Sequence, residues 1–128
     1  MPLIRISLRK GKPAGHIQAI RDAVYLSLRE TFNVPENDRF ILVHEHDDTG
    51  FDYDPAYPGL ARTGDVVFIQ ITANNTRTVE QKQALYRRIA DRLAESPGLR
   101  GDDVFINLVE VAKENWSFGN GIAQYVSP

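Results

Sequence analysis

The hydrophobic positions of the chain change period several times, and each period predicts one kind of element. Residues 3–8 form a short apolar run broken only at Arg5 and Ser7, which is typical of a strand. Apolar side chains then recur at steps of three and four over residues 17–32, which predicts an amphipathic helix of about four to five turns. The next apolar run, at residues 40–43, predicts a second, buried strand.

The same succession returns in the second half of the chain. A strand is expected at about residues 66–72. Residues 78–81 read Thr-Val-Glu-Gln, a capping-box pattern that predicts the start of a second helix, and residues 85–93 carry its apolar stripe. Ser-Pro-Gly at 96–98 ends that helix, and a fourth strand is expected at 104–109. The second half therefore predicts the same order of strand, helix and strand.

The two halves match at a constant offset of 65 positions. The matched pairs are Leu3 with Phe68, Ile4 with Ile69, Ile6 with Ile71, Ile20 with Leu85, Val24 with Ile89, Leu28 with Leu93, Asp38 with Asp103, Phe40 with Phe105 and Ile41 with Ile106. Since the match has no gap, we expect one domain of residues 1–128 built from a duplicated β-α-β unit. The halves lie at about 2–46 and 66–110 and are joined by the loop 47–64. Unrelated β-α-β units need the same pattern, so chance agreement is the alternative.

Two such units predict an α/β (α+β) fold with a four-stranded mixed sheet. Each unit joins two parallel strands through a right-handed helical crossover. A pseudo-twofold relation between the units would place both helices on one face of the sheet. Near-continuous apolar strands are typical of strands that are buried on both faces. Because two helices cover only one face, we expect an oligomer to cover the other.

Composition narrows the class of protein. The chain has 128 residues, of which 42% are hydrophobic and 25% charged, which is typical of a soluble globular domain. The net charge of −2 gives no reason to expect nucleic acid or a membrane as a partner. Without cysteine, the chain has no disulfide, thiolate metal site or cysteine nucleophile. With neither a signal-peptide pattern nor an apolar run of membrane-spanning length, we expect a cytoplasmic protein.

The N-terminus offers a candidate catalytic group. Pro2 opens the first strand, and removal of Met1, which small second residues usually permit, would make its nitrogen a free secondary amine. An α-amino group titrates near ~8, and burial lowers its pKa whereas nearby carboxylates raise it. Pro2 could then transfer protons near neutral pH. The alternative is that proline at this position has only a structural role.

The expected topology brings two charged residues to the same edge of the sheet as Pro2. Asp38 precedes the second strand, which starts at the same edge as the first because the two run parallel. The antiparallel third strand would end there and deliver Arg77, which can hold a carboxylate bidentately. The alternatives are a strand-entry aspartate, as Asp103 at the matching position suggests, and a solvated arginine.

Four stretches of sequence carry a resemblance to a known family. They are Met-Pro-Leu-Ile at 1–4, Val-Pro-Glu-Asn-Asp-Arg-Phe at 34–40, Arg-Thr-Val-Glu-Gln-Lys at 77–82 and Asn-Trp-Ser-Phe-Gly-Asn-Gly at 115–121. Together they resemble the malonate semialdehyde decarboxylase branch of the tautomerase superfamily, whose members use an N-terminal proline as catalytic base or acid. The resemblance spans almost the whole chain, and the tail motif is its most specific part.

The resemblance implies roles for particular residues. Pro2 would be the catalytic amine, Asp38 the carboxylate that activates water, and Arg77 a ligand of the substrate carboxylate. Trp116 and Phe118 would form an apolar wall of the pocket. The family fold is a duplicated β-α-β that forms trimers, so the resemblance implies a homotrimer acting on a small carboxylate substrate without a cofactor.

One position departs from the family pattern. The decarboxylase branch has two arginines that flank a single residue, and the first of them falls at Asn75 here. Asn75 offers substrate only neutral hydrogen bonds, which are roughly half as strong as charge-assisted ones. We therefore expect keto–enol tautomerisation of a 2-oxo acid rather than efficient decarboxylation or hydration. A non-catalytic trimeric binding or scaffold protein is the third interpretation.

Two histidines near the end of the second strand are candidate metal ligands. His44 and His46 would lie on one face if that strand continues, and two imidazoles at this spacing can share a metal. No third ligand is evident beyond Asp47 or Asp48, so we expect no metal site.

Overall fold

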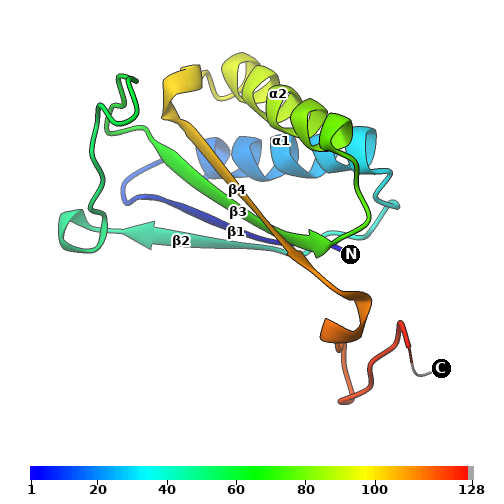
Figure 1. Cartoon of the computed structure of the whole chain (residues 1–128). Helices are drawn as coiled ribbons and strands as arrows, with labels where there is room; N and C mark the ends of the chain where they lie inside the picture. Colours follow the sequence, from blue (N-terminus) through cyan, green and yellow to red (C-terminus); the bar gives the residue numbers. More distant parts are fainter. Residues whose placement is uncertain (127–128) are drawn as a thin grey trace.

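The computed structural model describes residues 1–126 and consists of one four-stranded sheet covered by two helices on one face (Figure 1). In chain order the strands and α-helices are β1 (Leu3–Arg9), α1 (Ala14–Phe32), β2 (Ile41–His46), β3 (Val67–Asn74), α2 (Val79–Glu95) and β4 (Val104–Val111). Short 3-10 helices lie at Asp48–Gly50, Gly101–Asp103 and Lys113–Asn115. The strand order is β2-β1-β3-β4, with β1 parallel to β2, β3 parallel to β4 and β1 antiparallel to β3. The predicted mixed sheet is therefore confirmed.

The pairing of the strands repeats the offset of 65 positions seen in the sequence. Ile4 pairs with Ile41 in the first parallel pair, and Ile69 pairs with Ile106 in the second, so both members move by the same 65 positions. Where the two halves meet, Arg5 of β1 faces Gln70 of β3, which is its own counterpart at that offset. The two β-α-β units are therefore related by a local pseudo-twofold axis that passes between these strands.

The core lies between the sheet and the helix layer. Its central members are Ile4, Ile6 and Leu8 of β1, Val67, Ile69 and Ile71 of β3, Ile20, Val24 and Leu28 of α1, and Leu85, Ile89 and Leu93 of α2. Alternate strand positions thus face the i, i+4 stripes of the helices. Each fully buried aliphatic side chain contributes about 1.5–3 kcal/mol relative to exposure. This packing fixes which strand ends lie together.

The helix ends follow from local sequence. Thr78 caps α2 as predicted, because its side chain accepts from the backbone of Gln81 while the Gln81 side chain accepts from the backbone of Thr78. Helix α1 ends at Asn33, which adopts the left-handed conformation (φ 55°) that asparagine tolerates. No helix within residues 1–126 is both long and apolar enough to cross a membrane.

The sheet face away from the helices is open in the single chain. Burial alternates along β1 and β4, so one face of these strands is not buried within the single chain. Polar side chains such as Arg5 and Gln70 lie on this face. Leu42 and Phe105 on this face are nevertheless 46% and 44% exposed. A covering oligomer stays a prediction.

Both irregular segments fall where the sequence placed them. Residues 47–64 contain the 3-10 helix Asp48–Gly50 and otherwise run as turns and extended chain to β3. The tail beyond β4 holds Trp116 and forms a turn in which Ile122 N donates to Gly119 O. The tail leaves the sheet at the edge where the N-terminus lies (Figure 1).

Candidate active site

The terminal amine lies between side chains from distant parts of the chain. The Met1 nitrogen is 3.8 Å from Asp38 Oδ2 and donates to the Tyr125 hydroxyl at 3.2 Å. Asp38 reaches this point from the turn before β2, and Tyr125 reaches it from the tail after β4. The parallel pairing of β1 and β2 therefore produces the approach of Asp38 to the N-terminus that the sequence predicts.

Asp38 has an acceptor atom that the protein leaves unused. Its side chain is only 16% exposed, and its buried Oδ1 has no hydrogen-bond partner among the described residues. Native proteins almost always pair such atoms, so an unpaired one indicates a place for water or a ligand. Asp103, its counterpart in the second half, is also buried but accepts from the Thr63 backbone and hydroxyl, both at 2.7 Å. Asp103 therefore has a structural role, which Asp38 does not share through the same hydrogen bonds.

Arg77 lies near enough to the terminal amine for its positive charge to act on it. It follows β3, and one guanidinium nitrogen donates to the Phe32 carbonyl at 2.9 Å. The guanidinium carbon lies 4.9 Å from the centre of the Phe32 ring, and a second nitrogen donates to Thr76 Oγ1 at 3.3 Å. A guanidinium has five N–H donors, so several remain for a ligand.

The surroundings of the terminal amine lower its pKa. Burial is the largest cause, because it disfavours the charged form. Asp38 opposes this and raises the pKa, whereas the positive charges of Arg77 and Lys113 lower it further. The net direction is downward from 8.0, which favours a neutral amine and hence a base.

A cavity of about 320 Å³ opens beside the terminal amine. It is lined by Met1, Pro2, Leu3, Phe40, Asn115, Trp116, Ser117 and Phe118. Pro2 is buried, and the rings of Trp116 and Phe118 stack with centroids 5.7 Å apart. The structure therefore brings Pro2, Trp116 and Phe118 to one cavity, with Asp38 and Arg77 acting on the amine at its edge.

Asn75 does not join this constellation in the single chain. Its backbone nitrogen donates to Val111 O at 3.0 Å, and the residue is exposed. Among the described residues its side chain makes no hydrogen bond. The neighbouring Asn74 is the buried asparagine instead.

Three residues near the amine were missed by sequence reasoning. Asn74 is 5% exposed; its Oδ1 accepts from Trp116 Nε1 at 2.7 Å and its Nδ2 donates to the Tyr125 hydroxyl at 3.2 Å. Lys113 Nζ lies 5.7 Å from the Tyr125 ring centre. The hydrophobic residues of the tail do not recur at a regular spacing, so no pattern predicts the positions of Tyr125 or Lys113. Asn74 is the polar residue at the end of β3 and precedes the exposed Asn75, and this position is the one signal that could have singled it out.

Comparison with known proteins assigns the family. A profile described as tautomerase enzyme matches residues 38–119, and a second profile with the same description matches residues 2–59. The chain belongs to the tautomerase family. The probable tautomerase YusQ of Bacillus subtilis (strain 168) is 41% identical over 126 residues, which are 98% of this chain and 99% of the relative.

Solved structures narrow the likeness within the tautomerases. FG41 malonate semialdehyde decarboxylase inhibited by 3-bromopropiolate is 40% identical with a TM-score of 0.89, covering 97% of this chain and 94% of that one. A second malonate semialdehyde decarboxylase is 30% identical with the same TM-score, covering 97% and 95%. A fused 4-OT symmetric trimer, 20% identical with a TM-score of 0.76 and 94% coverage of both chains, shares the fold. The chain is therefore an enzyme of the tautomerase superfamily and resembles its decarboxylase branch.

Other features of this tautomerase offer less chemistry. His44 Nε2 accepts a hydrogen bond from the Arg5 guanidinium at 3.1 Å, and His46 stacks on Phe51. Residues 1–126 contain no group of three or more side chains placed to hold a metal.

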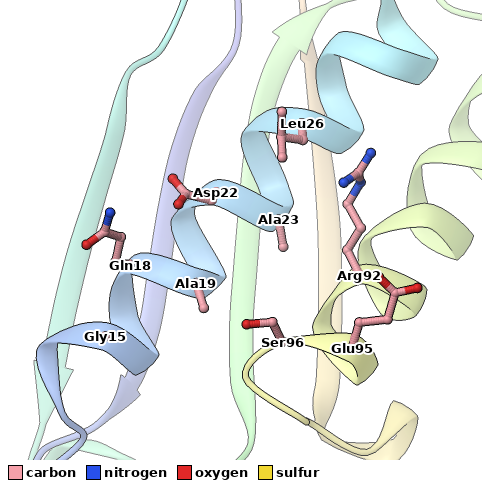
Figure 2. A pocket seen from close by; sticks show the side chains of 9 residues that line it. All are labelled: Gly15, Gln18, Ala19, Asp22, Ala23, Leu26, Arg92, Glu95 and Ser96. Carbon is pink, nitrogen blue, oxygen red and sulfur yellow. The ribbon is translucent and has the colours of Figure 1, made fainter.

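A hollow of about 340 Å³ lies between α1 and α2 on the helix layer, and Figure 2 shows its lining from both helices. Two of its charges are already paired, Asp22 with Arg39 at 2.6 Å and Arg92 with Glu30 at 3.1 Å. The cavity at the N-terminus is therefore the candidate active site.

Proposed function

We propose that Pro2, freed by removal of Met1, is the base for keto–enol tautomerisation of a small 2-oxo acid. The observation that carries this proposal is the lowered pKa of the terminal amine, which lies beside the cavity under the influence of burial, Arg77 and Lys113. The proposal extends this direction to Pro2, whose nitrogen would face the same charges of Asp38, Arg77 and Lys113 once Met1 is removed. A base with a pKa near the working pH combines a large neutral fraction with useful basicity.

The proposed reaction moves one proton between oxygen and carbon. The Pro2 nitrogen accepts the proton of the enol hydroxyl, and the carbon–oxygen bond becomes a carbonyl as the electron pair shifts to C3. The nitrogen then returns the proton to C3, so the amine is regenerated and nothing else is consumed. Arg77 holds the substrate carboxylate with N–H groups not used by Phe32 and Thr76. Trp116 and Phe118 exclude water from the apolar side of the cavity.

A second candidate function is hydration or decarboxylation of a 3-oxo acid. The observation in its favour is the unpartnered Oδ1 of Asp38, which can hold and activate a water molecule. The 40% identity to a malonate semialdehyde decarboxylase supports the same chemistry. This route needs a protonated Pro2, and at Asn75 it lacks a second positive charge.

The test begins with the intact mass of the purified protein, which establishes the loss of Met1. The processed protein and its Pro2→Ala variant are then assayed with phenylenolpyruvate and with malonate semialdehyde. A variant with one extra residue before Pro2 is the matched control, because it keeps the proline ring but has no secondary amine.

We expect tautomerisation of phenylenolpyruvate, a large but incomplete loss in Pro2→Ala, which retains a primary amine, and a similar loss in the extended control. Faster turnover of malonate semialdehyde than of phenylenolpyruvate would favour the second function. Equal rates for all three proteins on both substrates would remove Pro2 from the mechanism and leave the non-catalytic interpretation.

A further inference from the structure

Three polar side chains are buried among the described residues: Ser27, Asn74 and Asp103. Two of them stabilise a helix or a loop, whereas Asn74 bonds to the tail. Ser27 donates to the Ala23 carbonyl within α1, and Asp103 anchors the loop through Thr63. Asn74 instead connects the end of β3 to two residues of the tail, Trp116 and Tyr125. Burying an amide is costly unless both its ends are paired, so this connection has a defined geometry.

The chemistry of Trp116 fixes the orientation of the Asn74 amide. An indole nitrogen can only donate, and Trp116 Nε1 lies 2.7 Å from Asn74 Oδ1. The amide nitrogen of Asn74 must therefore face the Tyr125 hydroxyl, 3.2 Å away. Because that nitrogen has only donors, the Tyr125 oxygen accepts.

The Tyr125 hydroxyl cannot give its proton to Asn74, because the Asn74 nitrogen already donates to the Tyr125 oxygen. Among the described residues, no other side chain or backbone oxygen accepts from this hydroxyl. The Met1 amine, which reaches the same oxygen at 3.2 Å, is absent once Met1 is removed. The network therefore presents a hydrogen-bond donor at the edge of the cavity.

The position of the Met1 nitrogen becomes available to substrate after Met1 is removed, and it lies next to Pro2, the new N-terminus. Met1 and Pro2 both line the cavity, and removal of Met1 gives its volume to the substrate. The position of the Met1 nitrogen is 3.2 Å from the Tyr125 oxygen and 3.8 Å from Asp38 Oδ2. A substrate atom at that point lies within hydrogen-bond range of Tyr125.

We propose that Tyr125 is a further catalytic residue, whose hydroxyl donates to the substrate oxygen that becomes negative during proton transfer by Pro2. Asn74 and Trp116 are positioning residues, which hold the Tyr125 oxygen as an acceptor and leave its proton to the substrate. This role rests on the proposed function. Tyr125 keeps its proton throughout, so no further acid or base is required. The Tyr125 hydroxyl donates a hydrogen bond to the reacting oxygen, while Arg77 binds the substrate carboxylate.

A binding experiment tests this role without turnover. Oxalate is a planar dianion in which one carboxylate mimics the substrate carboxylate and the other mimics an enolate oxygen. Calorimetric titration of the processed protein with oxalate is compared with Tyr125→Phe and with Tyr57→Phe, a matched control on an exposed loop. We expect Tyr125→Phe to weaken oxalate binding by about tenfold, as loss of a hydrogen bond to a charged group does. Equal affinities, or no binding of oxalate by the parent, would overturn the proposal.

Kinetics separate a catalytic role from a merely structural one. Tyr125→Phe should lower kcat for phenylenolpyruvate by between about tenfold and a hundredfold, with little change in KM, because the oxygen is most negative in the transition state. Asn74→Leu should lower kcat in the parent but cause no further loss in Tyr125→Phe, since Asn74 acts through Tyr125. Additive losses, or a change confined to KM, would contradict the assignment.

The two proposals fail in different ways. If Pro2→Ala matches the parent while Tyr125→Phe still weakens oxalate binding, the function of Pro2 is wrong and Tyr125 is a ligand-binding residue only. If Pro2→Ala is impaired while Tyr125→Phe matches the parent in both measurements, the proline chemistry holds and Tyr125 has no part in it. Unchanged melting temperatures of the variants exclude unfolding as the cause.

Discussion

The terminal nitrogen of Met1 lies 3.8 Å from Asp38 Oδ2, and this pair joins the start of the chain to the turn that precedes β2. The parallel register of β1 and β2, in which Ile4 pairs with Ile41, places these two groups at one edge of the sheet. Arg77 and Lys113 act on the same nitrogen with the opposite sign. If Pro2 is the base, as we propose, its pKa depends on the balance of these charges.

Asp38→Asn separates the two candidate reactions. Asp38 raises the pKa of the terminal amine, so its neutralisation lowers that pKa and favours the neutral base. We expect the ascending limb of kcat/KM for tautomerisation to move to lower pH in Asp38→Asn, with activity retained. Hydration and decarboxylation need the carboxylate to activate water and should be lost. A variant that loses tautomerisation and keeps decarboxylation would contradict both assignments.

Arg77→Gln should move the same limb in the opposite direction. The positive charge of Arg77 lowers the pKa of the amine, so its removal raises that pKa, and the base becomes neutral only at higher pH. KM for the oxo acid should also rise by about tenfold or more, as expected for loss of a charge-assisted hydrogen bond. Arg87→Gln, at an exposed position of α2, is the matched control and should change neither quantity. A limb that stays in place would remove Arg77 from the electrostatics of the site.

Asn75→Arg tests whether the neutral residue limits decarboxylation. If the second arginine of the decarboxylase branch acts on bound substrate, its restoration should lower KM for malonate semialdehyde by about tenfold. Gln83→Arg adds the same charge at an exposed position of α2 and controls for general electrostatic attraction. Equal responses of the two variants would show that Asn75 does not face the substrate in the assembled enzyme.

The open sheet face predicts a homotrimer. Leu42 and Phe105 are exposed apolar side chains on that face, and burial of such groups favours association. Light scattering should give three times the chain mass of 14.4 kDa for the parent. Phe105→Glu should dissociate the trimer, whereas Val79→Glu, at an exposed position of α2, should not. A parent protein at the mass of one chain would refute this prediction.

The periodicity of the apolar residues was sufficient to predict the fold, because the same offset relates the strands and the helices of the two halves. The apolar stripes at Ile20 and Leu85, at the same offset as their strands, predicted the duplicated unit and thus which strand ends meet. Pro2, Asp38 and Arg77 could be brought together on that basis alone, since each adjoins a strand end. The apolar strands also indicated burial on both faces, and since their exposure alternates within the single chain, burial of the second face depends on the predicted oligomer.

The tail shows where sequence reasoning stops. Tyr125 lies beyond the last strand, and its position is set by hydrogen bonds to Asn74 and Met1 and by its edge-on contact with Phe118. None of these contacts has a period along the chain. Lys113 and Asn74 share this property, because their relation to the amine depends on how the tail folds back after β4.

The most direct test of the central claim is a titration of the Pro2 nitrogen itself. Processed protein labelled with ¹⁵N-proline allows the Pro2 amine to be followed by NMR across a range of pH, with Asp38→Asn and Arg77→Gln as reporters of the local charges. A catalytic base requires the pKa of Pro2 to lie below that of an exposed α-amino group, about 8, and to fall in Asp38→Asn and rise in Arg77→Gln. A Pro2 nitrogen that stays protonated well above that pH would contradict the tautomerase mechanism and make Pro2 an acid.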